Sequence, residues 1–390
     1  MIRVKKIAVF GGVFDPVHNG HLRAAEIVEK HLNPDIMLFI PSGNPPHKRK
    51  HMTLSRHRLE MLKEAVFEKF GDNAKVCDYE INEPDFSYTA KTLAHLKGVY
   101  GKECQLYFVI GADNITEIKG WYRPDIITSL ATLTVVARPG FDEKIATDIF
   151  PECVVCKGES IDISSTMIRN LSSDGKDFSH MVPASVYSYI KENSLYPKTK
   201  TDIEEIKNIV SSFLKPSRME HTLNVASISV KLAKIYEADI KKAETAALLH
   251  DIAKNLSLQE MLKYCEKYDI IIDSMQKEQK SLLHSIVAEA IAFYELGIND
   301  NLILNAIRFH TTGCAGMEVL TKIVFLADAI EPLRSYNGVD ELRILAETDL
   351  DSACIKSLDN TISYLISQNE KIHSDTIDTR NFLIKTKSER

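Results

Sequence analysis

The sequence predicts an α/β domain built on a parallel sheet, followed by an all-α domain. In the first half of the 390-residue chain, short apolar runs alternate with helix-like stretches, a pattern typical of a parallel sheet with helices on both faces. After about residue 197 the alternation ends and amphipathic helical patterns take over. The length also favours more than one domain. We therefore expect an N-terminal domain over 1–197, a linker over 198–204 and a C-terminal domain over 205–390.

Each expected strand is a short apolar run rich in β-branched or aromatic residues. The runs lie at 7–10, 36–40, 106–110, 133–137 and 153–156, with helices expected at 22–28, 55–70 and 87–97. In a parallel sheet, ligands bind beyond the C-terminal ends of the strands. Functional residues are therefore expected in the segments that directly follow the strands.

Composition narrows the class of protein. Hydrophobic residues make up 44% of the chain and charged residues 26%, as in ordinary globular proteins. No apolar run reaches about 18 residues and no secretory signal precedes the first strand, so neither a membrane span nor a membrane partner is expected. The odd number of cysteines, 7, fits a reducing cytoplasm. The net charge of −6 argues against nucleic acid as a partner. The sequence leaves open whether the chain forms a homo-oligomer.

The first functional signal is a glycine turn between the first strand and the first helix. Residues 11–21 are Gly-Gly-Val-Phe-Asp-Pro-Val-His-Asn-Gly-His. Gly11 and Gly12 let backbone N–H groups approach a phosphate, and the helix N-terminus favours an anion. His18 and His21 can share one face at the start of the helix. The turn suits a triphosphate, although an ordinary turn with two surface histidines would show the same residues.

A second motif, Ile-Ser-Ser-Thr-Met-Ile-Arg, occupies 163–169. Serine and threonine before a helix are good N-caps, so a purely structural role would explain them. The same hydroxyl groups, followed by Arg169, also suit the β- and γ-phosphates of ATP. Between the two motifs, a proline-rich basic loop over 41–48 follows the second strand.

Together these motifs resemble those of bacterial nicotinate-nucleotide adenylyltransferases, a family of α/β nucleotidyltransferases with a Rossmann-like sheet and an H-x-G-H motif. The resemblance covers 1 to about 197. It implies transfer of an adenylyl group from ATP to nicotinate mononucleotide, which gives deamido-NAD and pyrophosphate, with Mg²⁺ on the ATP. Another acceptor, such as phosphopantetheine, stays open as an alternative.

The resemblance also implies roles for individual residues. His18 and His21 are expected at the phosphoryl oxygens, and Lys48 and Arg169 at the leaving end of the triphosphate. Trp121 is expected to stack on the nicotinate ring. The family usually has threonine or serine where this chain has Val13, so one hydroxyl contact is absent. The implied substrate-binding residues are Gly11, Gly12, Phe14, Tyr88, Thr89, Gly111, Asp113, Trp121, Arg138, Ser164, Ser165 and Thr166.

The second half places ionisable residues on the apolar faces of five expected helices. A single histidine on such a face is usually a core residue, but burying several separately costs several kcal/mol unless each finds a partner. A shared metal centre relieves all of them, and a nitrogen and oxygen donor set suits iron, manganese or zinc rather than calcium. The residues concerned are His221, His250, Asp251, His284, His310 and Asp328.

Two further features of this half are local. Ser217 and Glu220 have the S-x-x-E spacing of a capping box, so a helix is expected to begin there. Lys254 lies four residues after His250 and is expected on the surface.

The order of these histidines and aspartates resembles that of the HD phosphohydrolases. The surrounding segments 248–251, 282–284, 310–313 and 327–334 are similar to those of bacterial HD-domain hydrolases that split diadenosine tetraphosphate symmetrically into two ADP. The resemblance implies a two-metal site in which Asp251 bridges and is catalytic, with Arg218, Thr311 and Arg334 at the phosphates. Two alternatives stay open: hydrolysis of another nucleotide, and a nucleotide-sensing regulatory module.

Overall fold

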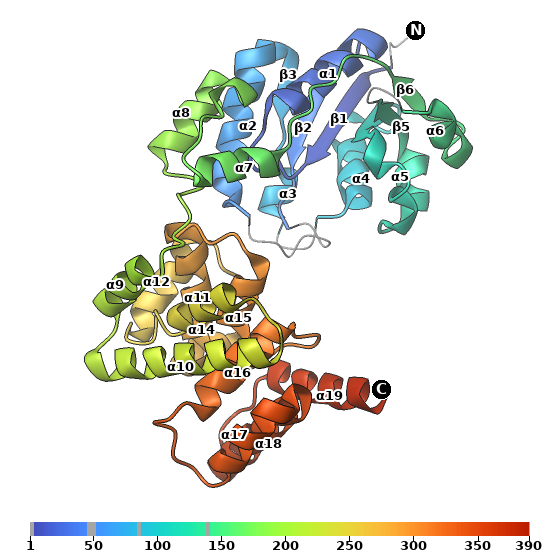
Figure 1. Ribbon diagram of the computed structural model, residues 1–390. Coiled ribbons are helices and arrows are strands. Elements are labelled where there is room, and N and C mark those ends of the chain that lie inside the picture. The colour runs from blue at the N-terminus through green and yellow to red at the C-terminus, as the bar shows by residue number, and fades with distance from the viewer. Residues whose placement is uncertain (1–3, 45–51, 84–86, 138–140, 390) are drawn as a thin grey trace. The chain divides into compact units, whose positions relative to one another are not determined.

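The computed structural model describes residues 4–44, 52–83, 87–137 and 141–389 (Figure 1). The chain divides into two compact units, Met1–Tyr196 and Pro197–Arg390. Lys48, expected at the leaving end of the triphosphate, and Arg138, expected to bind the nucleotide substrate, lie outside the described residues, as does the side chain of Asp113.

The N-terminal unit is built on a parallel sheet, as predicted. Among the described residues the strand order is β3-β2-β1-β4-β5-β6, and every neighbouring pair is parallel. The strand order reverses between β1 and β4, and a ligand crevice in such sheets lies at the C-terminal ends of the two strands at that point. The strands are β1 Lys6–Gly12, β2 Ile36–Pro41, β3 Ala74–Val76, β4 Gln105–Gly111, β5 Ala131–Val136 and β6 Val154–Cys156.

Helices cover both faces of this sheet (Figure 1). Alternate residues of β1 explain why: Ala8 and Phe10 pack with α1, α2, α7 and α8, whereas Ile7 and Val9 face α4, α5 and α6. The helices are α1 Asn19–Leu32, α2 Ser55–Phe70, α3 Tyr79–Asn82, α4 Thr89–Tyr100, α5 Pro124–Leu130, α6 Glu143–Ile149, α7 Ser165–Ser173 and α8 Ala184–Glu192.

The C-terminal unit is helical throughout its described residues, which confirms the predicted all-α domain. Its apolar faces form one core, to which α9 to α12 and α14 to α19 contribute. The helices are α9 Ile203–Phe213, α10 Pro216–Ile235, α11 Ile240–Leu249, α12 Leu258–Lys267, α13 Ser274–Glu278, α14 Lys280–Ala290, α15 Asn301–Phe309, α16 Val319–Ile330, α17 Val339–Thr348, α18 Leu350–Ser367 and α19 Ser374–Ser388, and a π-helical turn, Ile291–Glu295, continues α14.

Two local features differ from the sequence-based expectations. The predicted capping box is wrong: α10 begins at Pro216, with Lys215 as the N-cap, so Ser217 already lies inside the first turn. Proline is favoured at the first helical position because its missing N–H would be unpaired there anyway. The strand β3 was not predicted, since its three residues include the exposed Lys75 and form no apolar run.

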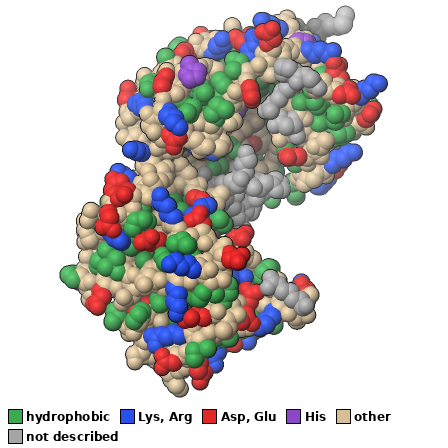
Figure 2. All heavy atoms as spheres, viewed as in Figure 1, with side chains coloured by type: hydrophobic (Ala, Val, Ile, Leu, Met, Phe, Trp, Pro, Cys, Tyr) green, Lys and Arg blue, Asp and Glu red, His purple; other side chains and the backbone are tan. Residues whose placement is uncertain are grey.

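The distribution of surface charge and the hydropathy of the helices are relevant to the expectation that neither nucleic acid nor a membrane is a partner. Acidic and basic side chains are interspersed over both units on the face that Figure 2 shows. Across the described part of the chain, none of the helices combines the length and the hydropathy that crossing a bilayer requires.

Candidate active sites

The glycine turn lies where β1 ends. Gly11 and Gly12 are the last residues of this strand and pair with Ile40 and Pro41 of β2. A Cβ atom on Gly12 would lie 3.1 Å from the Phe14 ring, so the turn has little room for a side chain there. Glycine at position 12 therefore lets the Phe14 ring pack directly against the backbone of the turn.

The two histidines of the turn stack on each other at the start of α1. His18 is the N-cap residue, and its ring centroid lies 3.7 Å from that of His21. Phe14, buried and with a φ of 51°, packs edge-on against His21 at 5.0 Å. Burial lowers the pKa of His18 to about 4, so this imidazole is neutral near pH 7. Its buried Nδ1 has no hydrogen-bond partner among the described residues.

The late serine-threonine segment packs directly onto the glycine turn. Arg169, in α7, donates from Nη1 to the carbonyl oxygen of Asp15 at 2.6 Å. The Ser165 hydroxyl donates to the carbonyl oxygen of Pro16 at 2.9 Å. Ser164 caps α7 by accepting from the N–H of Met167 at 3.1 Å. Segments about 150 residues apart in the sequence thus form one wall beside the two histidines.

Arg169 also ties its own helix together. Its Nη2 donates to the Thr166 hydroxyl at 3.2 Å. The guanidinium group is half-buried, whereas Thr166 is exposed. Both side chains therefore stand at the surface of this wall, where a bound phosphate would meet them.

The aromatic residues expected to contact the nicotinate ring lie past the end of β4. Gly111 is the last residue of that strand. Trp121 is half-buried and packs edge-on against Phe108 of the same strand, with ring centroids 6.2 Å apart. Tyr88 is the N-cap of α4, which begins at Thr89, and its ring lies 4.3 Å from that of the exposed Tyr122.

A buried arginine that the sequence motifs did not reveal joins the loops of this site. Arg58, in α2, is 1% exposed and donates to the carbonyl oxygens of Val13, Ser42 and Thr53 at 2.8, 2.7 and 2.9 Å. One guanidinium group therefore connects the glycine turn to the loop after β2. Its sequence signal was its place on the apolar stripe that continues at Met61.

Asp15, within the glycine turn, is a second residue whose role the sequence motifs did not reveal. Its carboxylate accepts a hydrogen bond from the Tyr196 hydroxyl at 2.7 Å and another from the N–H of Thr53 at 3.1 Å. Both Asp15 and Tyr196 are buried. Burial and the Asp15 charge raise the pKa of Tyr196, so the phenol remains a donor.

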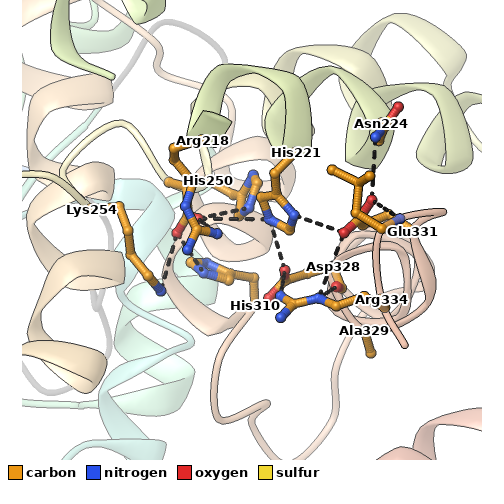
Figure 3. Close-up of polar contacts among 12 residues, drawn as sticks. Arg218, His221, Asn224, His250, Lys254, His310, Asp328, Ala329, Glu331 and Arg334 are labelled. Carbon is orange, nitrogen blue, oxygen red and sulfur yellow. Dashed lines mark hydrogen bonds and ion pairs between the residues drawn. The ribbon is translucent and has the colours of Figure 1, made fainter. Parts of the chain in front are cut away.

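The C-terminal unit gathers histidines and aspartates from five helices at one place (Figure 3). They come from α10, from the C-terminal ends of α11 and α15, and from α14 and α16. Their donor atoms form three overlapping groups, in each of which the atoms lie within 4.8 Å of one another: His221, His250 and Asp251; His250, His310 and Asp328; and Asp251, His284 and His310.

Asp251 stands between two pairs of imidazoles. Its Oδ2 lies 3.8 Å from His221 Nε2 and 3.5 Å from His250 Nε2. Its Oδ1 lies 3.0 Å from His284 Nε2 and 3.7 Å from His310 Nε2. Each oxygen of the carboxylate therefore faces one pair of imidazoles.

The donor atoms fit a metal site better than a hydrogen-bond network. Among the described residues, His250 Nε2 is buried without a hydrogen-bond partner. His221 Nε2 and Asp251 Oδ1 are also buried, and their short contacts are with other members of the cluster, Asp328 Oδ1 at 3.1 Å and His284 Nε2 at 3.0 Å. His284 Nε2 and His310 Nε2 approach to 3.1 Å, a contact that a shared cation would stabilise. Burial lowers the pKa of both His250 and His284 to about 4, so each is a neutral imidazole and a competent ligand.

Two arginines flank the aspartates of this cluster. Arg218 donates to Asp251 Oδ2 at 3.0 Å, and Arg334 donates to Asp328 Oδ1 at 2.5 Å. Burial opposes ionisation of both aspartates, but the imidazoles and basic groups around them hold the pKa of each carboxyl well below its ordinary value. Both aspartates are therefore available as charged ligands.

Lys254 is not the surface residue that we expected. It is half-buried, and its Nζ lies 3.0 Å from His284 Nε2 and 3.5 Å from Asp251 Oδ1. Thr311 also lies beside the cluster, with its hydroxyl 3.2 Å from His310 Nε2. Lys254 is thus a further basic group beside His284 and Asp251.

Comparison with known proteins defines the class of each unit. The cytidylyltransferase-like family matches residues 9–171, and the HD domain family matches residues 218–333. The N-terminal half is 39% identical over 202 residues to a probable nicotinate-nucleotide adenylyltransferase of Clostridium botulinum, covering 50% of this chain and 98% of that protein. The C-terminal half is 42% identical over 180 residues to a symmetrical bis(5'-nucleosyl)-tetraphosphatase of Halalkalibacterium halodurans, covering 45% of this chain and 94% of that protein.

The fold and the two sites therefore define a nucleotidyltransferase joined to an HD-domain protein. The chain belongs to the nicotinate-nucleotide adenylyltransferase family in its N-terminal half and to the symmetrical bis(5'-nucleosyl)-tetraphosphatase family in its C-terminal half. A Mycoplasma genitalium protein named as a probable nicotinate-nucleotide adenylyltransferase/Ap4A hydrolase is 29% identical over 365 residues, covering 91% of this chain and 97% of that protein.

Proposed function

We propose that the chain is a bifunctional enzyme. Residues 1–197 transfer the adenylyl group of ATP to nicotinate mononucleotide, giving deamido-NAD and pyrophosphate. Residues 205–390 hydrolyse diadenosine tetraphosphate symmetrically to two ADP. The free cysteines of the described chain support a reducing, cytoplasmic compartment.

The observation that carries the first activity is the contact between α7 and the glycine turn, which places hydroxyl groups and Arg169 beside His18 and His21. The phosphate of nicotinate mononucleotide attacks the α-phosphorus of ATP in line, and pyrophosphate leaves; Mg²⁺ bound to the ATP would neutralise phosphate charge. Because no side chain forms a covalent bond, catalysis depends on positioning and on stabilising charge at the phosphoryl oxygens. Neutral His18 supplies a hydrogen bond there, and Arg169 neutralises charge on the leaving group.

The observation that carries the second activity is the division of four imidazoles between the two oxygens of Asp251. The six ligands would hold two ions of iron, manganese or zinc, which supply Lewis acidity and activate a water. Arg218, Lys254, Thr311 and Arg334 then bind the phosphate chain. Every expected ligand position is filled, and a complete ligand set favours a hydrolase over a non-catalytic nucleotide sensor.

Product analysis tests both activities on the purified full chain. With ATP, we expect turnover of nicotinate mononucleotide to exceed that of nicotinamide mononucleotide and phosphopantetheine. Absence of turnover with nicotinate mononucleotide would overturn the first assignment.

For the second activity, elemental analysis should find a transition metal, and diadenosine tetraphosphate should yield ADP as the sole product. AMP together with ATP would contradict symmetrical cleavage. A metal-free protein without hydrolase activity would favour the sensor alternative.

A further inference from the structure

Glu331 lies directly behind one of the candidate metal ligands (Figure 3). Its Oε1 is 3.1 Å from Nδ1 of His221, and the residue is only 1% exposed. The opposite nitrogen of that ring, Nε2, is 3.1 Å from Oδ1 of Asp328. The imidazole of His221 thus spans the distance between a buried carboxylate and the ligand cluster.

His221 differs in this respect from two neighbouring histidines. Nδ1 of His250 is 2.6 Å from the carbonyl oxygen of Ala247, and Nδ1 of His310 is 2.7 Å from that of Ile307. Those two rings are held by neutral backbone groups of their own helices. A carboxylate is a stronger acceptor, and it raises the basicity of the far nitrogen of the ring.

Glu331 is itself held in place from two sides. Its Oε2 accepts from the N–H of Leu333 at 2.8 Å and from Nδ2 of Asn224 at 3.3 Å. The first contact fixes the carboxylate to the turn after α16, and the second fixes it to α10, the helix that carries His221. The carboxylate is therefore oriented by groups outside the ligand cluster.

We propose that Glu331 is a positioning residue for the metal centre. It accepts a hydrogen bond from Nδ1–H of His221, which fixes the tautomer and leaves the Nε2 lone pair available to a metal. This inference rests on the proposed metal-dependent function, because it assigns a role to a residue that supports one of the ligands.

The test is a titration of the apo-protein with Mn²⁺ after chelator treatment of the full chain. We expect Glu331→Gln to bind Mn²⁺ about 10–100-fold more weakly than the wild type, with an unchanged circular dichroism spectrum. The matched control is Glu289→Gln, which removes another buried carboxylate, one that pairs with Arg308 at 2.5 Å. The control should bind Mn²⁺ as the wild type does.

Wild-type affinity in a folded Glu331→Gln protein would overturn the inference while leaving the metal centre intact. Failure of the wild type itself to bind Mn²⁺ would instead overturn the proposed metal centre. If Glu331→Gln does not fold, Asn224→Ala decides: we expect a several-fold loss of Mn²⁺ affinity because one donor that orients Glu331 is gone, and unchanged affinity would overturn the inference. Adenylyl transfer should be unaffected in all three variants.

Discussion

Histidines in the two units are buried for different reasons. His18 is buried against aromatic neighbours in the N-terminal unit, and burial alone accounts for its lowered pKa. His250 and His284 also have lowered pKa values, but they face a carboxylate that a bound cation would share with them. Of these three described histidines, His18 is the one whose titration depends on the polypeptide alone.

The first prediction concerns the pH dependence of stability. The pKa of His18 is about 4 in the folded state and about 6.5 when unfolded, so only the unfolded state takes up this proton as the pH falls below 6.5. The free energy of unfolding therefore falls as the unfolded state gains this proton. The stability that neutral His18 allows is fully present above pH 6.5 and is lost towards pH 4, and the loss is about 2 kcal/mol between about pH 7.5 and about pH 5.

Trp121, the only tryptophan of the chain, allows unfolding of the N-terminal unit to be followed by fluorescence. His18→Gln should show a flatter pH profile than the wild type over this range. Parallel profiles would mean that His18 does not titrate differently in the two states.

Two kinds of local contact position helices and loops in this chain: the N-caps of helices and close backbone contacts. The cap of α7 stands at the proposed ATP site, whereas the similar cap of α9 belongs to the other unit. The loop after β2 passes so close to α3 that a Cβ atom on Gly43 would lie 1.9 Å from the carbonyl oxygen of Glu80. The cap of α9 at Asp202 serves as a control for the cap of α7, and Gly98 in α4 serves as a control for Gly43.

The second prediction separates capping from substrate binding. Ser164→Ala removes the cap of α7 and should cost about 1 kcal/mol of stability. It should also raise KM for ATP about fivefold, equivalent to about 1 kcal/mol, because the helix start loosens at the phosphates. Asp202→Ala removes the cap of α9 at a similar cost in stability, but steady-state kinetics should show an unchanged KM for ATP. Equal KM values in the two variants would restrict Ser164 to a structural role.

The third prediction concerns the contact at Gly43. Gly43→Ala forces the loop away from the Glu80 backbone and should destabilise the N-terminal unit by about 1–3 kcal/mol. Gly98→Ala is the control, since no described neighbour lies within 4 Å of the position that its methyl group would take, and alanine is favoured inside α4 by about 0.5–1 kcal/mol. Denaturant unfolding followed by Trp121 fluorescence would measure both, and a stable Gly43→Ala protein would refute the close contact.

For the whole molecule, the two units have separate cores. The apolar clusters on the two faces of the sheet contain only residues up to 196, and the helical core contains only residues from 203 onward. Neither candidate site includes a described residue of the other unit. The two activities should therefore be separable by single substitutions.

The fourth prediction tests this independence. His21→Ala should lower adenylyl transfer at least about 100-fold and leave hydrolysis unchanged, and Asp251→Ala should do the reverse. Assays of both reactions on each purified variant would check this. Loss of both activities from either substitution would show that the units are functionally coupled.

Sequence patterns predicted the features that repeat along the chain. The apolar runs of β1, β2, β4 and β5 and the helical stripes bearing the histidines have regular spacing, so the parallel sheet and the helical domain could be predicted. The contacts of Arg58 and Glu331 could not be predicted, because the position of a charged residue in the sequence does not show which distant groups it binds. Their partners, such as the carbonyl group of Val13 and the ring of His221, are distant in sequence.

The hydroxyl of Tyr196 has a consequence for how such a fused chain could be divided. This residue is the last of the N-terminal unit, and its hydroxyl is hydrogen-bonded to Asp15 in the turn that carries His18 and His21. A gene fission or proteolytic cut just before it would remove one of the two hydrogen-bond donors to the buried Asp15 carboxylate, whereas a cut just after it would spare that bond. A division of this chain into two independent polypeptides should therefore lie after Tyr196.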